Sequence, residues 1–471
     1  MQSPVRFTDT LPVIIRRYDF ILLFLLLFLV YNTVSGFGTI SGDVAPASLL
    51  PVALLTTHTP YLDYATPFIS SPHYSYAFPL VQGHYVSLFP IVTPVLATPV
   101  YAISYVLCNL FGVTFTFNEF FLLAKTAAAV IAALAGVLVY LSGKELFSKR
   151  IALLTTIIFA FATSTWSISS QALWQQGTVE LLLSALLYLI IRNEKKESLV
   201  YLLLMGILSG LFVFNRPPDS LLLIPVIFYM VWYQRTKIHY YLIGGILGGL
   251  PFLYYNYSIF GSVFGGYADN LSLFAVNGGF VGHLLGLLLS PNGGLFIFCP
   301  VLLLSLAGFY LIYSNRDSHI RTLLLVSGLA VLLEILMYSF WNTLSASAAF
   351  CFGPRYLTGL IPILCLFTGY FLEDWFGTGK AGHQGTKQWI AVAVVGGLIV
   401  VSICIQFIGA FYYLWSSDAN KTMNDDRAWN ITDSVIIGSY TTGSPKITGV
   451  SIYTLPPLPP LFDYNFRSSG T

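Results

Sequence analysis

The sequence predicts an all-α integral membrane protein with about eleven transmembrane helices. Of its 471 residues, 56% are hydrophobic and only 9% are charged, whereas soluble domains carry about 25% charged residues. Apolar runs recur along the whole chain, which is typical of a polytopic helical membrane protein. The formal net charge of +2 is too small to indicate nucleic acid as a partner, so the expected partner is the lipid bilayer.

Lysine and arginine are sparse enough to mark the side of the membrane on which each loop lies. Most of the 22 basic residues fall in six segments, which the positive-inside rule assigns to the cytoplasm. We therefore expect a multi-pass protein of the plasma membrane with a cytoplasmic N-terminus. The basic segments are 1–17, 143–150, 192–197, 233–239, 314–321 and 377–387.

An even number of crossings must separate consecutive cytoplasmic loops, and this condition excludes one apolar run as a span. Three apolar runs precede the basic segment 143–150, at 18–34, 88–111 and 120–141. The run 88–111 has prolines at positions 90, 94 and 99, which make a poor lipid-exposed helix. We expect it to lie along the outer face or to dip into it. Residues 36–118 then form one long extracytoplasmic loop that carries surface-lying helices.

The remaining apolar runs are expected to cross the membrane, which places the C-terminus outside the cytoplasm. Residues 1–415 form the expected transmembrane domain, and 416–471 a small extracytoplasmic tail in which 434–443 reads as extended. The further spans are 151–163, 178–191, 199–214, 221–233, 240–257, 295–313, 322–341, 355–372 and 390–415.

Three of these helices, 151–163, 178–191 and 221–233, are shorter than the about 20 residues that span a bilayer. Their outer ends must stop below the membrane surface, where non-helical backbone survives only inside protein or beside water. The connecting segments 163–178 and 215–220 are rich in polar and aromatic residues. A recessed, hydrated cavity that opens outward is the simplest interpretation.

Arg216 and Arg355 lie at expected extracytoplasmic helix ends, away from the cytoplasmic loops. A guanidinium group is a forked donor that phosphate accepts well, so the pair indicates a phosphate clamp. The structural alternative is snorkelling to lipid headgroups, or an ion pair such as Arg216 with Asp219.

Asp43 opens the long outer loop in the stretch GDVAPASLL. The pattern fits the N-cap of a helix, and it equally fits a catalytic acid facing the same side as the arginines. One residue can serve both purposes. Asp63 and His84 share the loop, where lone histidines are more often structural than functional.

Four passages resemble the GT-C superfamily of polytopic glycosyltransferases, which use polyprenyl-phosphate-linked sugars. SGD at 41–43 matches the acidic motif of the first outer loop, and 83–101 resembles the Gly-x-Tyr segment with repeated prolines. The passages 289–309 and 352–364 resemble recurring stretches of prokaryotic members, so the likeness covers about residues 20–415. Two departures are Val44, where many members have a second acid, and Phe89-Pro90 in place of the usual double proline.

The resemblance implies an inverting transfer in which Asp43 is the base and Arg216 and Arg355 hold the departing phosphate. No metal site and no cofactor are expected; a divalent cation is the alternative, because relatives with pyrophosphate-linked donors use one. The competing functions are a transporter or flippase of lipid-linked glycans and a non-catalytic subunit with this fold. Five further residues are substrate-binding candidates: Asp63, His84, Tyr85, Trp174 and Gln175.

Overall fold

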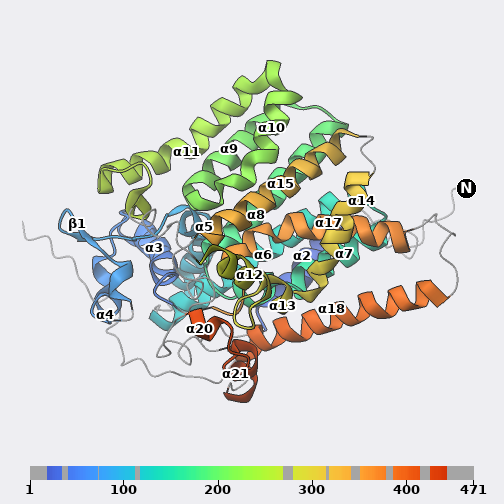
Figure 1. The fold of residues 1–471 in the computed structure, drawn as a ribbon. Coiled ribbons are helices and arrows are strands. Elements are labelled where there is room, and N and C mark those ends of the chain that lie inside the picture. Colours follow the sequence, from blue (N-terminus) through green and yellow to red (C-terminus); the bar gives the residue numbers. More distant parts are fainter. Residues whose placement is uncertain are drawn as a thin grey trace, which may run out of the picture.

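The computed structural model describes residues 18–33, 41–72, 74–111, 117–268, 279–314, 318–340, 351–377, 386–413 and 425–442. Within these ranges the protein is a bundle of α-helices, which confirms the all-α prediction (Figure 1). The sheet found there is a two-stranded antiparallel hairpin, β1 (Leu80–Val81) and β2 (His84–Tyr85), with Leu80 opposite Tyr85.

The helices follow the predicted apolar runs closely. Their bounds are α2 (Asp19–Tyr31), α3 (Ala45–Thr56), α4 (Thr66–Ile69), α5 (Val92–Phe111), α6 (Phe117–Leu146), α7 (Lys149–Phe161), α8 (Gln175–Lys195), α9 (Leu199–Asn215), α10 (Ile224–Trp232), α11 (Ile238–Phe260), α12 (Phe280–Leu289), α13 (Leu295–Phe298), α14 (Leu304–Ser314), α15 (His319–Ser339), α17 (Ile361–Phe376), α18 (Thr386–Tyr412), α20 (Asp425–Ala428) and α21 (Val435–Thr442).

Proline residues divide three of the predicted spans. The 3₁₀ turns η5 (Pro217–Leu223), η8 (Pro300–Leu303) and η9 (Arg355–Leu360) each begin at or directly after a proline and lead into α10, α14 and α17. A proline lacks the N–H that an α-helix interior requires, so it is tolerated in the first turn. These tight turns leave the side chains of 216–219 and 355–356 at the ends of helices.

Four described helices are long and apolar enough to cross a membrane: Phe120–Leu146, His319–Ser339, Arg355–Phe376 and Trp389–Tyr412. The other apolar helices are shorter, among them α2, α9 and α14, or less apolar. The expected eleven crossings therefore stay a prediction, as does the side on which each terminus lies.

Two helices differ from the sequence prediction. α12 was not expected, because a ten-residue apolar run is too short to register as a span. The segment expected to be extended, 434–443, instead contains the helix α21, which spans Val435–Thr442. Its β-branched residues favour strands. Packing against α18 overrides that preference, as does the hydrogen bond that the first helical N–H, of Val435, donates to the Asn292 side-chain oxygen.

Helix α3 of the outer loop is covered by protein, and the expectation that this loop carries surface-lying helices stays a prediction. Residues from Ala45 to Ala53 are buried on every side of this helix, and α3 packs against α5 and α6. A helix that is apolar all round belongs in a protein interior. Part of the outer loop is therefore embedded in the bundle, and Asp43 at its entrance is held by the fold.

Ion pairs connect four of the six basic segments, 143–150, 192–197, 233–239 and 314–321, at one end of the bundle. Asp19 pairs with Lys144 and Lys149, at 3.3 and 2.8 Å. The same end holds three further links: Glu145 with Arg192 and Lys195, Glu197 with Lys237, and Glu194 with His319. Helix α8 ends and helix α9 begins at this end of the bundle. The start of α8 and the end of α9, and the residues beside them, therefore lie at the opposite end.

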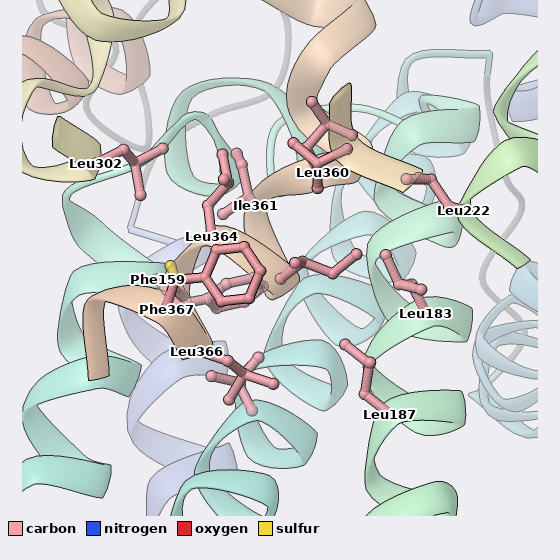
Figure 2. Packing of buried hydrophobic residues seen from close by; sticks show 14 of the residues in the cluster. Phe159, Leu183, Leu187, Leu222, Leu302, Leu360, Ile361, Leu364, Leu366 and Phe367 are labelled. Atoms are coloured by element: carbon pink, nitrogen blue, oxygen red, sulfur yellow. The ribbon is translucent and has the colours of Figure 1, made fainter. Parts of the chain in front are cut away.

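The core surrounds α17, the most buried of the four long helices. Figure 2 shows Leu364 and Phe367 of this helix packed among side chains from α7, α8, η5 and η8. The first turn of the segment, η9, is also fully enclosed from Tyr356 to Leu360. This packing fixes the helix end at which Arg355 stands.

Helices α9 and α11 pack through glycines at very close range (Figure 1). A Cβ atom on Gly244 would overlap the carbonyl oxygen of Leu203 and lie 3.0 Å from the Cα of Gly206. On the neighbouring Gly245, a Cβ would meet nothing closer than 3.9 Å.

Gly244→Ala is therefore expected to destabilise the protein by about 1–3 kcal/mol, the usual cost of overpacking. Gly245→Ala, on the same helix, is expected to be neutral or slightly stabilising, because alanine is the better helix former. Thermal unfolding of the two variants in detergent measures the difference. Equal melting temperatures would contradict the close packing of α9 against α11.

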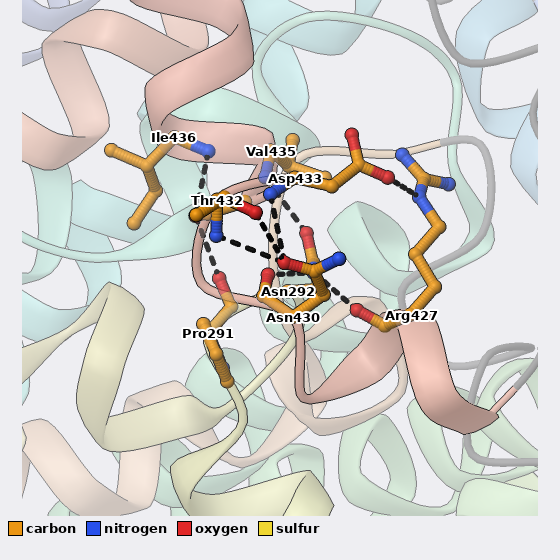
Figure 3. A network of polar contacts seen from close by, with 9 residues as sticks. Pro291, Asn292, Arg427, Asn430, Thr432, Asp433, Val435 and Ile436 are labelled. Atoms are coloured by element: carbon orange, nitrogen blue, oxygen red, sulfur yellow. Dashed lines mark hydrogen bonds and ion pairs between the residues drawn. The ribbon is translucent and has the colours of Figure 1, made fainter.

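The described part of the tail is anchored on the turn that precedes α13 (Figure 3). The Asn292 side-chain amide donates to the carbonyls of Arg427 and Asn430, at 2.6 and 3.3 Å. Its oxygen accepts from the Val435 N–H at 2.7 Å. Asn292 lies in the passage 289–309 that resembles the GT-C superfamily, and in this chain it holds residues 425–442 in place.

Candidate functional site

Asp43 and Arg355 meet although 312 residues separate them in the chain. The Nη1 atom of Arg355 donates to Oδ2 of Asp43 at 2.5 Å, and their side chains are 7% and 25% exposed. Asp43 does not cap α3: the N-cap is Val44, and no side chain caps this helix end. The carboxylate is instead directed toward the arginine at the end of η9.

Tyr76 holds the other oxygen of the same carboxylate. Its hydroxyl donates to Oδ1 of Asp43 at 2.6 Å. Partial burial raises the pKa of Tyr76, and the adjacent Asp43 carboxylate raises it further, so this phenol stays a donor. Gly42 permits the contact, because a Cβ at this position would lie 2.5 Å from the Tyr76 hydroxyl oxygen. Sequence reasoning missed Tyr76, since one tyrosine in an aromatic-rich loop carries no distinguishing pattern.

Arg216 forms a second buried cluster at the end of α9. Its Nε donates to Oδ1 of Asp219 at 2.8 Å, and the two side chains are 4% and 0% exposed. Nη2 donates to the Tyr338 hydroxyl at 3.0 Å. Among the described residues, Nη1 makes two long contacts, at 3.5 Å to Gln175 and 3.4 Å to Tyr267. The ion pair with Asp219 that the sequence offered as a structural alternative is present, and one edge of the guanidinium is loosely held.

Tyr356 lies between the two arginines. The guanidinium carbon of Arg355 is 5.0 Å from the centre of its ring, and that of Arg216 is 5.3 Å away. Nη2 of Arg355 also donates to the Tyr356 hydroxyl at 3.3 Å. Tyr338 stacks on the same ring with a centroid distance of 5.1 Å. Both guanidinium groups therefore contact the same residue, Tyr356. Asp43 is connected to this cluster through its ion pair with Arg355.

Trp174 and Gln175, at the start of α8, complete the surroundings of the arginines. The Trp174 ring centre is 4.9 Å from the guanidinium carbon of Arg355, and Gln175 lies beside Arg216. The chain before them leaves α-helical geometry, with a π-helical turn at Thr165–Ser169. α7 is short, with 13 residues, but the expectation of a short helix at 178–191 is wrong, because α8 has 21 residues. The segment between them is not α-helical, as expected, and residues 162–174 are buried in protein. The hydrated cavity stays a prediction.

Asp63, in the 3₁₀ turn Asp63–Ala65, forms a separate cluster with His84 and Tyr85 of the β-hairpin. Oδ2 of Asp63 contacts Nδ1 of His84 at 2.7 Å, and Oδ1 accepts from the Tyr85 N–H at 2.7 Å. His84 stacks on Tyr61, with ring centres 4.0 Å apart. No hydrogen bond or ion pair between described residues joins this cluster to Asp43 or the arginines, so the structure does not bring all predicted site residues together.

The site thus offers two buried guanidinium groups, phenol hydroxyls and one partly exposed carboxylate. Guanidinium and phenol groups suit an anionic phosphate, and a carboxylate suits a general base. Among the described residues, no group of three or more His, Cys, Asp or Glu side chains is placed to hold a metal ion.

Residues 104–255 match the profile of the family described as dolichyl-phosphate-mannose-protein mannosyltransferase. Two solved structures are similar in fold. ArnT from Cupriavidus metallidurans, bound to undecaprenyl phosphate, has 13% identity and a TM-score of 0.52, over 89% of this chain and 76% of its own. The apo oligosaccharyltransferase from Archaeoglobus fulgidus has 12% identity and a TM-score of 0.51, over 83% of this chain and 56% of its own. No curated protein matches the chain in sequence.

Proposed function

We propose that this chain, which has the fold of GT-C glycosyltransferases, transfers a sugar from a polyprenyl-phosphate donor to an acceptor hydroxyl. The observation that supports this most is the Asp43–Arg355 contact, with Arg216 on the same tyrosine. An acid and two phosphate ligands are the groups that such a transfer needs. The undecaprenyl phosphate bound by ArnT supports a lipid phosphate as the donor class.

In this proposal the donor phosphate binds to both Arg216 and Arg355, which flank Tyr356, and the prenyl chain lies in the apolar bundle. The phosphate competes with Asp43 for Arg355. Donor binding therefore separates the ion pair, places the sugar between carboxylate and guanidinium, and frees Asp43 to act as a base.

The chemical step is a single displacement at the anomeric carbon. The acceptor oxygen forms a bond to that carbon, and its proton passes to Asp43. The bond from the anomeric carbon to the phosphate oxygen breaks, and the electron pair leaves with polyprenyl phosphate. Arg216 and Arg355 stabilise the charge that develops on the phosphate. The displacement inverts the anomeric configuration.

We assign the reaction to the extracytoplasmic face of the plasma membrane. Asp43, Arg216 and Arg355 lie at helix ends opposite to the ion-paired basic segments, which the positive-inside rule places in the cytoplasm. Trp174 and Gln175 are the residues best placed to contact the donor beside the arginines. Asp63, His84 and Tyr85 stay substrate-binding candidates in their separate cluster. The proposed step requires no cofactor.

The test is a transfer assay with the purified protein in lipid nanodiscs. A panel of polyprenyl-phosphate sugars, labelled in the sugar, is supplied with a membrane extract as the source of acceptors. The proposal predicts one free polyprenyl phosphate released for each sugar transferred. A transporter would move the intact donor between vesicle leaflets without releasing it, and a non-catalytic subunit would do neither.

Gly42→Ala and Tyr76→Phe are expected to have the same effect, because each removes the hydrogen bond from Tyr76 to Asp43. A bond to a charged group contributes about 1.5–3 kcal/mol, so kcat/KM should fall by about 10- to 150-fold in either variant. The double variant should be no worse than the singles, since both changes remove one interaction. Additive losses in the transfer assay would show that Gly42 acts independently of Tyr76.

A further inference from the structure

Glu334 is a buried acid that the proposed reaction does not use. It lies on α15, one turn before Tyr338, so both side chains are on the same helix face. Glu334 is 1% exposed, and α15 packs against η5, which carries Asp219. The acid therefore faces the cluster that holds Arg216.

The hydrogen bonds around Asp219 are unevenly divided between its two oxygens. Oδ1 accepts from Nε of Arg216 at 2.8 Å and from the Tyr338 hydroxyl at 2.5 Å. Oδ2 is buried and receives no donor from the described residues, and the same holds for both carboxyl oxygens of Glu334. Tyr338, one turn after Glu334 on α15, donates to Asp219, and α15 packs against η5, so the Glu334 carboxyl is on the helix face that meets Asp219 and Arg216.

A carboxylate oxygen only accepts hydrogen bonds, and two buried carboxylates in contact cannot both be ionised. A proton held between them removes the repulsion and provides the missing donor. The other charged or titratable groups of this cluster among the described residues are Arg216, Tyr338, Tyr267 and Tyr356. Since Oδ1 of Asp219 already has two donors, the proton belongs between Oδ2 and Glu334.

We propose that Glu334 is a protonated positioning residue, which donates a hydrogen bond to Oδ2 of Asp219 and thereby aims Arg216 at the donor phosphate. The second half of this statement rests on the proposed function. With the proton present, the cluster of Arg216, Asp219 and Glu334 is neutral. Loss of the proton at alkaline pH adds a negative charge beside Arg216 and repels the phosphate.

Infrared difference spectroscopy tests the proton without reference to activity. The spectrum of wild type minus Glu334→Gln, recorded at neutral pH, should contain the C=O stretch of a protonated carboxyl group. Absence of this band would overturn the inference. A band in a protein that transfers no sugar would leave the protonated pair in place and reject the proposed function instead.

The pH dependence of donor KM in the transfer assay tests the positioning role. The wild-type KM should rise at alkaline pH, whereas Glu334→Gln, whose amide still donates, should stay within about threefold of wild type and lose that rise. Glu334→Leu, which offers no donor, should raise the donor KM by at least about tenfold at every pH.

Glu180→Gln is the matched control. Glu180 is also a buried acid, on α8, but it accepts a hydrogen bond from the Thr165 hydroxyl and is not part of the Asp219 cluster. It should keep the wild-type pH profile. Equal effects of Gln and Leu at position 334, or an alkaline rise that persists in Glu334→Gln, would overturn the assignment.

Discussion

Asp43→Asn is expected to lower the transfer rate by about 10²–10⁴-fold, the usual contribution of a positioned general base. The same variant should bind polyprenyl phosphate more tightly than wild type. The reason is that the ion pair of Arg355 with Asp43 competes with the phosphate, and an amide removes this competition. Single-turnover assays measure the fall in the transfer rate, and binding of a fluorescent polyprenyl phosphate measures the rise in affinity.

Asp19→Asn is the matched control for this variant. Asp19 is also an ion-paired aspartate, held by Lys144 and Lys149, but it lies at the opposite end of the bundle. It should leave both transfer and lipid binding unchanged. If Asp43→Asn kept more than about a tenth of the wild-type rate, Asp43 would not be the base, because a base contributes at least about 10²-fold.

Arg216→Gln is expected to lose both stability and lipid binding. The substitution leaves the fully buried Asp219 without its guanidinium partner, and an uncompensated buried charge costs about 3–5 kcal/mol. Arg216→Gln/Asp219→Asn removes that charge as well, so most of the stability should return. Affinity for polyprenyl phosphate should stay about 10- to 150-fold below wild type, the value of a lost charged hydrogen bond.

This pair of variants separates the two interpretations of Arg216. If the residue served only its ion pair, the double variant would recover lipid binding along with the melting temperature. Arg192→Gln/Glu145→Gln, which removes a paired arginine among the basic segments, should retain wild-type affinity. Recovery of binding in Arg216→Gln/Asp219→Asn would exclude Arg216 from the phosphate site.

The helices could be predicted from the sequence because the length and apolarity of a run are local properties. Charges are rare in this chain, so the position of Arg216 and Arg355 at helix ends could be predicted as well. The Arg216–Asp219 ion pair could also be predicted, because residues three positions apart at a helix end lie close together. The helix α12 was not predicted, because its ten residues are too few to cross a membrane.

The contacts of the site could not be predicted, because they join segments that are distant in the chain. Nothing local to Asp43 indicates Arg355, and the pattern around Asp43 fitted a catalytic acid and a helix cap equally, of which the structure does not form the cap. Tyr76 is one of 30 tyrosines, and only the approach of its loop to Gly42 selects it. Likewise, Glu334 becomes informative only when η5 places Asp219 beside it.

The position of the lipid phosphate tests the account most directly. An electron cryomicroscopy structure of the protein with polyprenyl phosphate is predicted to show the phosphate oxygens within hydrogen-bonding distance of both Arg216 and Arg355. In that complex, Asp43 and Arg355 should no longer touch. A phosphate bound elsewhere, with the Asp43–Arg355 ion pair intact, would contradict the proposed transferase.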